Sequence, residues 1–108
     1  MVNDPNFQSE MAAQSLAMFE SRGEDLSDER HTIHYFYDGD HGALGEALRD
    51  LGFVVRPTVE NDGVVAERMD VTDETWRTET LTTLSELANQ YGSEYDGWEA
   101  AMTRQGTN

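Results

Sequence analysis

The chain has 108 residues and a formal net charge of −15 at pH 7, because 22 acidic residues outnumber seven arginines and no lysine is present. This length is typical of a single domain, and the absence of cysteine and of any long apolar run argues against a disulfide framework, a thiolate metal site and a membrane span. The charge disfavours direct binding of nucleic acid and favours a basic segment of another protein as partner, although acids also keep small domains soluble.

The first predicted element is a helix that follows Asp4 and ends before Gly23. Asp4 and Pro5 are typical of an N-cap and of the first helical position. A wide apolar face recurs at helical spacing and contains Phe7, Met11, Ala12, Leu16, Met18 and Phe19. We expect this face either to cover one side of a sheet or to meet a partner.

Residues 30–37 are rich in β-branched and aromatic side chains, which predicts a strand. The two faces of this strand carry His34 and Phe36 on one side and Ile33, Tyr35 and Tyr37 on the other. Apolar groups on both faces are typical of a central strand. A short helix is predicted over residues 41–51, with Asp40 as its N-cap and Gly52 directly after its end.

Two strands are predicted at residues 53–59 and 64–71, joined by a turn with the sequence Glu-Asn-Asp-Gly at residues 60–63. Pro57 has no N–H to donate, which predicts that the first of these strands lies at a sheet edge.

The longest predicted helix covers residues 72–91, with Thr72 as its N-cap. Its core stripe contains Leu81, Leu84, Leu87, Ala88 and Tyr91. A last strand is predicted over residues 94–98, where Gly97 permits a bulge or a close approach of another backbone.

This order of elements predicts an α+β protein with a ferredoxin-like βαββαβ sandwich, an antiparallel four-stranded sheet and an additional N-terminal helix. We expect strands one and three in the middle of the sheet and both crossover helices on one face. The expected organisation is an N-terminal helix over residues 1–23, the ferredoxin-like domain over 24–103 and a flexible tail over 104–108. The first residues do not have the pattern of a secretory signal, so we expect a cytoplasmic protein.

No pattern in the sequence indicates catalysis, a cofactor or a metal. His31 and His34 point to opposite faces of one strand, and residues 38–42 (Asp-Gly-Asp-His-Gly) lack the later oxygen ligands of a calcium loop. We therefore predict a non-enzymatic protein with no cofactor and no bound metal.

The segment Tyr-Asp-Gly-Trp at residues 95–98 places two large aromatic residues beside acidic ones. These rings either pack against the helices or anchor a partner, a role in which tyrosine and tryptophan are common. The candidate partner-binding residues are Glu94, Tyr95, Asp96, Trp98, Asp38 and Asp40.

Residues 88–99 (Ala-Asn-Gln-Tyr-Gly-Ser-Glu-Tyr-Asp-Gly-Trp-Glu) resemble the final helix and strand of the bacterial regulator of ribonuclease E activity B (RraB) family. The hairpin into a valine-rich strand, the threonine-rich long helix and the N-terminal helix are similar to that family's order. The resemblance implies a ferredoxin-like sandwich that inhibits or modulates ribonuclease E by docking on the enzyme's basic scaffold region rather than on RNA. The alternatives are an acidic interaction module with another basic client, or a nucleic-acid mimic.

Overall fold

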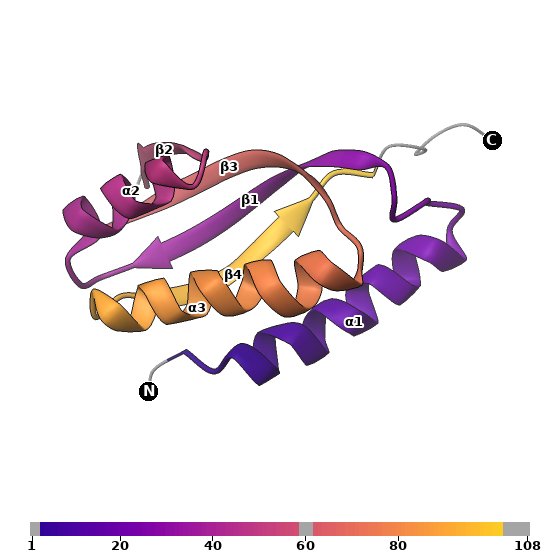
Figure 1. The fold of residues 1–108 in the computed structure, drawn as a ribbon, viewed down its shortest axis with the longest axis horizontal. Coiled ribbons are helices and arrows are strands. Elements are labelled where there is room, and N and C mark those ends of the chain that lie inside the picture. The colour runs from indigo at the N-terminus through magenta and orange to yellow at the C-terminus, as the bar shows by residue number, and fades with distance from the viewer. Residues whose placement is uncertain (1–2, 59–61, 103–108) are drawn as a thin grey trace.

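The computed structural model describes residues 3–58 and 62–102, so turn residues 60 and 61 and the tail at 104–108 lie outside the described residues. Its elements, in chain order, are α1 (Pro5–Ser21), β1 (Glu29–Tyr37), α2 (His41–Asp50), β2 (Val54–Pro57), β3 (Gly63–Val71), the π-helical segment η1 (Trp76–Thr80), α3 (Leu81–Gln90) and β4 (Glu94–Ala100) (Figure 1).

The four strands form one sheet in the order β2-β3-β1-β4, and every neighbouring pair is antiparallel. Strands β1 and β3 are central, which confirms the predicted ferredoxin-like arrangement. Strand β2 is shorter than predicted and ends at Pro57, and the N–H of Thr58 still donates to the carbonyl of Gly63 at 3.1 Å beyond it. Strands β2 and β4 are therefore the two edges of the sheet.

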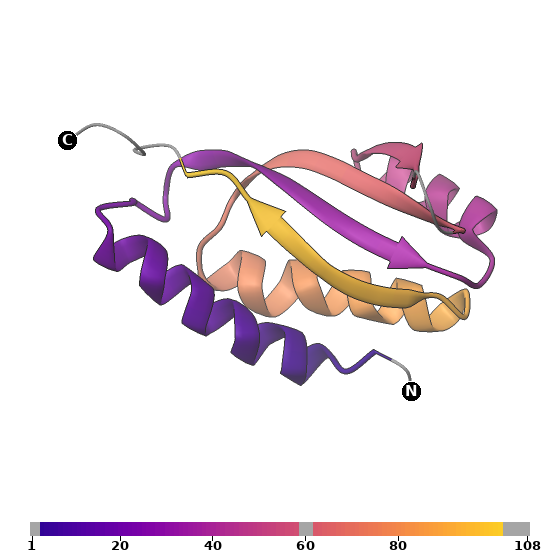
Figure 2. The ribbon, with the colours of Figure 1, turned by 180° about the vertical axis from the view of Figure 1, so that it is seen from behind.

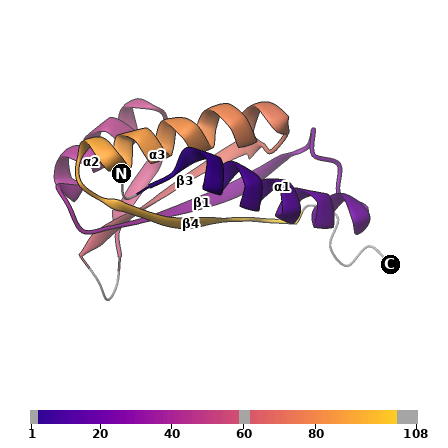
Figure 3. The same cartoon turned by 90° about the horizontal axis from the view of Figure 1, so that it is seen from below.

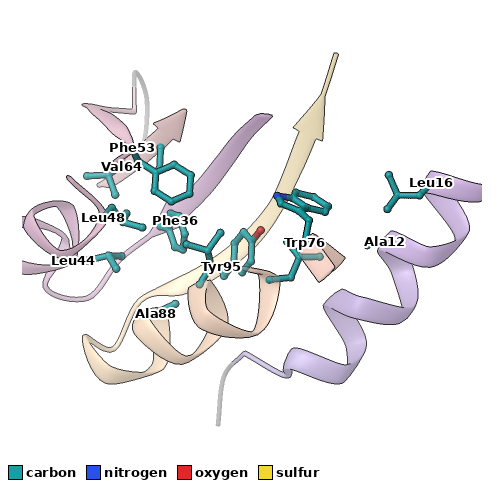
Figure 4. Packing of buried hydrophobic residues seen from close by; sticks show 13 residues of the cluster. Ala12, Leu16, Phe36, Leu44, Leu48, Phe53, Val64, Trp76, Ala88 and Tyr95 are labelled. Atoms are coloured by element: carbon teal, nitrogen blue, oxygen red, sulfur yellow. The ribbon is translucent and has the colours of Figure 1, made fainter. Parts of the chain in front are cut away.

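The hydrophobic core lies between the sheet and the helices α2 and α3 (Figure 4). Strand β1 contributes His34 and Phe36 to it, while Ile33, Tyr35 and Tyr37 on the opposite face are half-buried. Leu84 of α3 is fully buried, as its place in the predicted core stripe requires. Alternation along one strand thus separates an inward face from a face that meets solvent.

Helix α1 lies beside α3 and η1, so it extends the helical layer and leaves the second face of the sheet uncovered (Figures 1 and 3). Its Ala12 and Leu16 are buried, and Nη1 of Arg77 donates to Oγ of Ser9 at 2.8 Å. Of the two alternatives for this helix, covering the second face or meeting a partner, the structure excludes the first. Phe7 and Met11 stay 56% and 46% exposed, so much of the helix's wide apolar face has no cover within the described chain.

The helix starts are set by aspartates. The side chains of Asp4 and Asp40 accept backbone N–H groups of α1 and α2 at 2.9 and 3.1 Å, which confirms both predicted caps. The predicted cap at Thr72 is wrong, because Asp73 accepts the N–H of Trp76 at 3.0 Å instead. Thr72 is buried at the end of β3 and contributes no capping bond.

Candidate partner-binding site

Strand β4 contains a bulge that decides which way its aromatic side chains point. Gly97 lies opposite Tyr35, but Tyr95 lies opposite Phe36, so Asp96 is an extra residue on β4. Gly97 has a φ of 141°, a conformation that favours glycine. The extra residue puts Tyr95 and Trp98, three positions apart, on the same face of the sheet. Of the two alternatives that Gly97 permits, a bulge or a close approach of another backbone, the structure shows the bulge.

Tyr95 belongs to the core. Its side chain is 3% exposed and its ring stacks on Phe36 at 4.8 Å between centroids (Figure 4). Its hydroxyl lies 2.6 Å from Nδ1 of His34. Burial raises the pKa of the Tyr95 hydroxyl well above its usual range. Burial, helped by the positive charge of Arg68, lowers the pKa of His34 to about 3. A neutral phenol and a neutral imidazole therefore share this bond, and Tyr95 is inaccessible to a partner.

Trp98 is half-buried and lies at the boundary between core and surface. Its ring meets Trp76 of η1 edge to face, with 5.0 Å between centroids. The same residue lines a surface groove between α1 and β4. Of the two predicted aromatic candidates, Trp98 alone keeps a surface that a partner can contact.

Four exposed carboxylates meet at one corner of the sheet. Asp38, Asp62, Glu94 and Asp96 surround the half-buried ring of Tyr37 around an open pocket of about 420 Å³. We call these five residues the acidic corner. Three of the six predicted site residues, Asp38, Glu94 and Asp96, are brought together there.

Strand pairing explains why the corner forms. Tyr37 ends β1 and lies opposite Gly63 at the start of β3 and Glu94 at the start of β4. The N–H of Asp38 donates to the carbonyl of Asp62 at 2.7 Å, and Asp38 adopts a φ of 62°. Aspartate tolerates this left-handed conformation better than most residues. Gly39 then passes so close to the end of α3 that an added Cβ would lie 2.5 Å from the carbonyl oxygen of Tyr91.

Among the described residues, the arginines that form ion pairs contact acids outside the corner, and Arg49 and Arg56 line a second pocket together with Asp62. Arg30 pairs with Glu24, and Arg56 pairs with Glu67 on the uncovered sheet face. Arg68 pairs with Asp70 on β3, and Arg77 pairs with Glu74 at the start of η1. The corner therefore concentrates negative charge at the surface, where it attracts cationic groups and is screened by salt.

Asp40 lies close in sequence but has a local task. Its side chain accepts the N–H of Ala43 at 3.1 Å, and its backbone N–H donates to the carbonyl of Tyr91 at 2.8 Å. Asp40 does not line the corner pocket. It therefore connects the start of α2 to the end of α3, next to the acidic corner but outside its pocket.

The described residues contain no group of three or more His, Asp or Glu side chains arranged to hold a metal ion. Within the same part of the chain, no helix combines the length and the apolar character that crossing a bilayer requires.

Two residues of the acidic corner, Tyr37 and Asp62, were not among the site residues predicted from the sequence. Both follow from the predicted topology, because the end of the first strand must meet the starts of its two antiparallel neighbours. Combining the strand order with the acids that flank each strand would have identified Asp62.

The sequence matches the family model described as "Regulator of ribonuclease activity B" (RraB) over residues 9–100. No curated protein matches the sequence. The family match extends from α1 to the last residue of β4, and so it includes the bulge and all the residues of the acidic corner. The chain belongs to the RraB family of regulators of ribonuclease activity.

Proposed function

We propose that this protein is a non-enzymatic regulator that binds ribonuclease E, or a related RNA-processing enzyme, and inhibits or modulates its endonuclease activity. Membership of a family of ribonuclease regulators supports the regulatory role. The observation that carries the choice of partner is the acidic corner, where four exposed carboxylates gather beside one tyrosine.

A basic, extended protein segment is the partner that fits this surface. Arginine side chains bind carboxylates through planar, two-pronged hydrogen bonds, and Tyr37 offers a ring face for a guanidinium group. The net charge of −15 adds long-range attraction that speeds the encounter. The proposed contact is with the basic scaffold region of the ribonuclease, and the effect on RNA turnover follows from occupation of that region.

The test is binding of the purified chain to ribonuclease E of the source organism and to its isolated basic segment. One variant neutralises the corner with Asp38→Asn, Asp62→Asn, Glu94→Gln and Asp96→Asn. The matched control removes four exposed helical charges elsewhere, with Glu20→Gln, Glu46→Gln, Asp50→Asn and Glu86→Gln. Both variants change the net charge equally, so a corner site predicts that the first loses binding about tenfold more than the second.

A pull-down from native extract addresses the alternative partner. Ribonuclease E bound to the unmodified chain and lost from the corner variant supports the proposal. Capture of a different basic protein through the same corner assigns the domain to another client. Equal binding by both charge variants shows that the corner is not the site.

A further inference from the structure

A groove of about 580 Å³ is lined by residues of α1 and β4. Figure 2 shows these two elements from the side on which both lie in front. The groove walls include Phe7, Met11 and Phe19 of α1 and Asp96, Trp98 and Ala100 of β4. Because α1 packs on α3 and η1, it stands beside β4 without closing over it. The groove is therefore bounded by an apolar helix face and by the backbone of an edge strand.

The backbone of β4 presents outward-facing polar groups to this groove. The N–H of Ala101 donates to the carbonyl of His31, which fixes the bonding pattern with β1. In an antiparallel pair, bonded positions alternate. Glu99 and Gly97, opposite Ile33 and Tyr35, therefore direct their N–H and C=O groups toward β1, whereas Trp98 and Ala100 direct theirs outward.

The first part of the same edge is already covered by the chain's own N-terminus. Oδ1 of Asn3 accepts the N–H of Tyr95 at 2.6 Å, and Nε2 of Gln8 donates to its carbonyl at 3.3 Å. These two side chains satisfy the outward groups of Tyr95 as a neighbouring strand would. Beyond Tyr95 the two outward positions, Trp98 and Ala100, face the groove.

The opposite edge of the sheet is protected differently. Strand β2 has four residues and ends at Pro57, and both features discourage pairing with another chain. Strand β4 has seven residues and contains no proline. The longer, proline-free edge is thus the one that adjoins an apolar groove.

We propose that the groove binds an extended segment of the partner protein as a fifth strand paired with β4, a mode known as β-augmentation. The segment has alternating apolar and basic residues. The apolar side chains face Phe7 and Met11 of α1, and the basic ones face the opposite side of the extended sheet, where Glu99 lies opposite Ile33. Asp96 also belongs to the acidic corner, so the two surfaces are continuous.

A second copy of this chain fits the edge less well. Pairing two β4 edges would bring Asp96 and Glu99 of one molecule near the same residues of the other. Like charges across paired strands are destabilising, and each molecule carries a net charge of −15. Charge complementarity therefore selects a basic strand.

This inference rests on the proposed function, since it specifies how a basic partner segment is held. The probe is a capped peptide of alternating arginine and valine, six residues long. A second peptide has the same sequence with every backbone N–H methylated. It keeps the side chains and charges but has no backbone donors, so we expect it to bind at least about tenfold more weakly.

Amide hydrogen exchange reports the pairing directly. In the free protein, the N–H groups of Trp98 and Ala100 exchange faster than those of Gly97 and Glu99. At a peptide concentration about ten times Kd, exchange at Trp98 and Ala100 slows about tenfold, because only about a tenth of the molecules remain free.

Two substitutions on α1 give a matched pair. Met11→Lys places a positive charge in the groove, whereas Met18→Lys places it on an exposed position of the same helix that does not line the groove. Both change the net charge by one unit. Binding of the unmethylated peptide weakens about tenfold for the first and less than about twofold for the second.

Several results would overturn the inference. One is peptide binding that leaves Trp98 and Ala100 unprotected, and another is equal binding of the two peptides. Protection that grows with protein concentration in the absence of peptide, together with a dimer in sedimentation, would assign the edge to a second copy. Binding of ribonuclease E with no protection at β4 supports the proposed function alone. Protection by the peptide with no binding of ribonuclease E supports the β4 groove and overturns the proposed function.

Discussion

The two ends of β1 use acidic residues in opposite ways. At the first end, Oε1 of Glu24 lies 2.6 Å from Nη1 of Arg30, and both side chains are fully buried. The guanidinium of Arg30 also donates to the backbone carbonyls of Asp25 and Ala101 at 2.8 and 3.2 Å. Arg30 therefore pairs with a carboxylate inside the fold and connects β1 to the segment after α1 and to the end of β4.

At the other end of β1, the acidic corner contains four carboxylates that are exposed. They are held close together by the antiparallel pairing of β1 with β3 and β4. A buried acid makes the fold depend on its arginine partner, whereas exposed acids gathered at one corner create a field that acts on other molecules. The same residue type is therefore buried in an ion pair at one end of the strand and exposed at the other, where we propose that a partner binds.

The largest expected effect is at the buried end. Arg30→Ala leaves the carboxylate of Glu24 buried without its partner, which should lower the free energy of unfolding by about 3–5 kcal/mol. Urea denaturation measures this loss. The double variant Arg30→Met with Glu24→Leu should recover much of it, because an apolar pair replaces the ion pair. A loss below about 1 kcal/mol for Arg30→Ala would contradict the structural role of this end.

A smaller effect is expected at the middle of the strand, where His34 is buried and neutral. Its pKa is about 3 in the folded protein, against 6.5 for an unperturbed histidine. Between these values the unfolded chain binds more protons, so stability is retained above pH 6.5 and falls as the pH drops toward 3. The free energy of unfolding should fall by about 2 kcal/mol from pH 7 to pH 5 through this residue.

The control for this prediction is His34→Gln, which removes the titrating ring. Urea denaturation of both proteins at pH 7 and pH 5 separates the contribution of His34 from that of the other titrating groups. The stability of the variant should depend less on pH over this interval. Identical pH dependence in the two proteins would show that His34 does not resist protonation in the fold.

At the acidic corner, we expect substitutions to change stability little and to change association with a partner more. Asp38→Asn with Asp62→Asn should change the free energy of unfolding by less than about 0.5 kcal/mol, since both side chains are exposed. Association with a basic segment of ribonuclease E should slow, and its dependence on salt should weaken, because exposed charges are screened beyond about 8–10 Å at physiological ionic strength. Stopped-flow measurements at low and physiological salt test both points. A large loss of stability would make the corner structural.

The smallest effect is expected with RNA, for which we predict no saturable binding at low micromolar protein. Tyr35 and Tyr37 lie on the uncovered face and could each stack on a base for about 1–3 kcal/mol. However, the nearby Arg56 is paired with Glu67, and the corner adds negative charge beside Tyr37. Fluorescence anisotropy with single-stranded RNA at low salt tests this, and saturation there would show that aromatic stacking overcomes the field of the corner.

Local patterns in the sequence were enough for the elements and their order. Alternation separated the two faces of β1, helical spacing predicted the burial of Leu84, and Asp40 was recognisable as a cap. Gly97 permitted the bulge, with a close approach of another backbone as the alternative. These features depend on residues within a few positions of one another, or on topology rules that apply to every βαββαβ order.

Contacts between segments that are distant in the sequence decided which side chains are buried and which surfaces form. Residue spacing gives no sign that the bulge turns Tyr95 into the core, because strict alternation would place Tyr95 and Trp98 on opposite faces. The position of α1 beside α3 depends on which apolar stripe finds a partner, and the burial of Ala12 and Leu16 left Phe7 and Met11 exposed. The chain therefore determined its strands, helices and charge by itself, whereas the acidic corner and the β4 groove exist only because packing brings remote residues together.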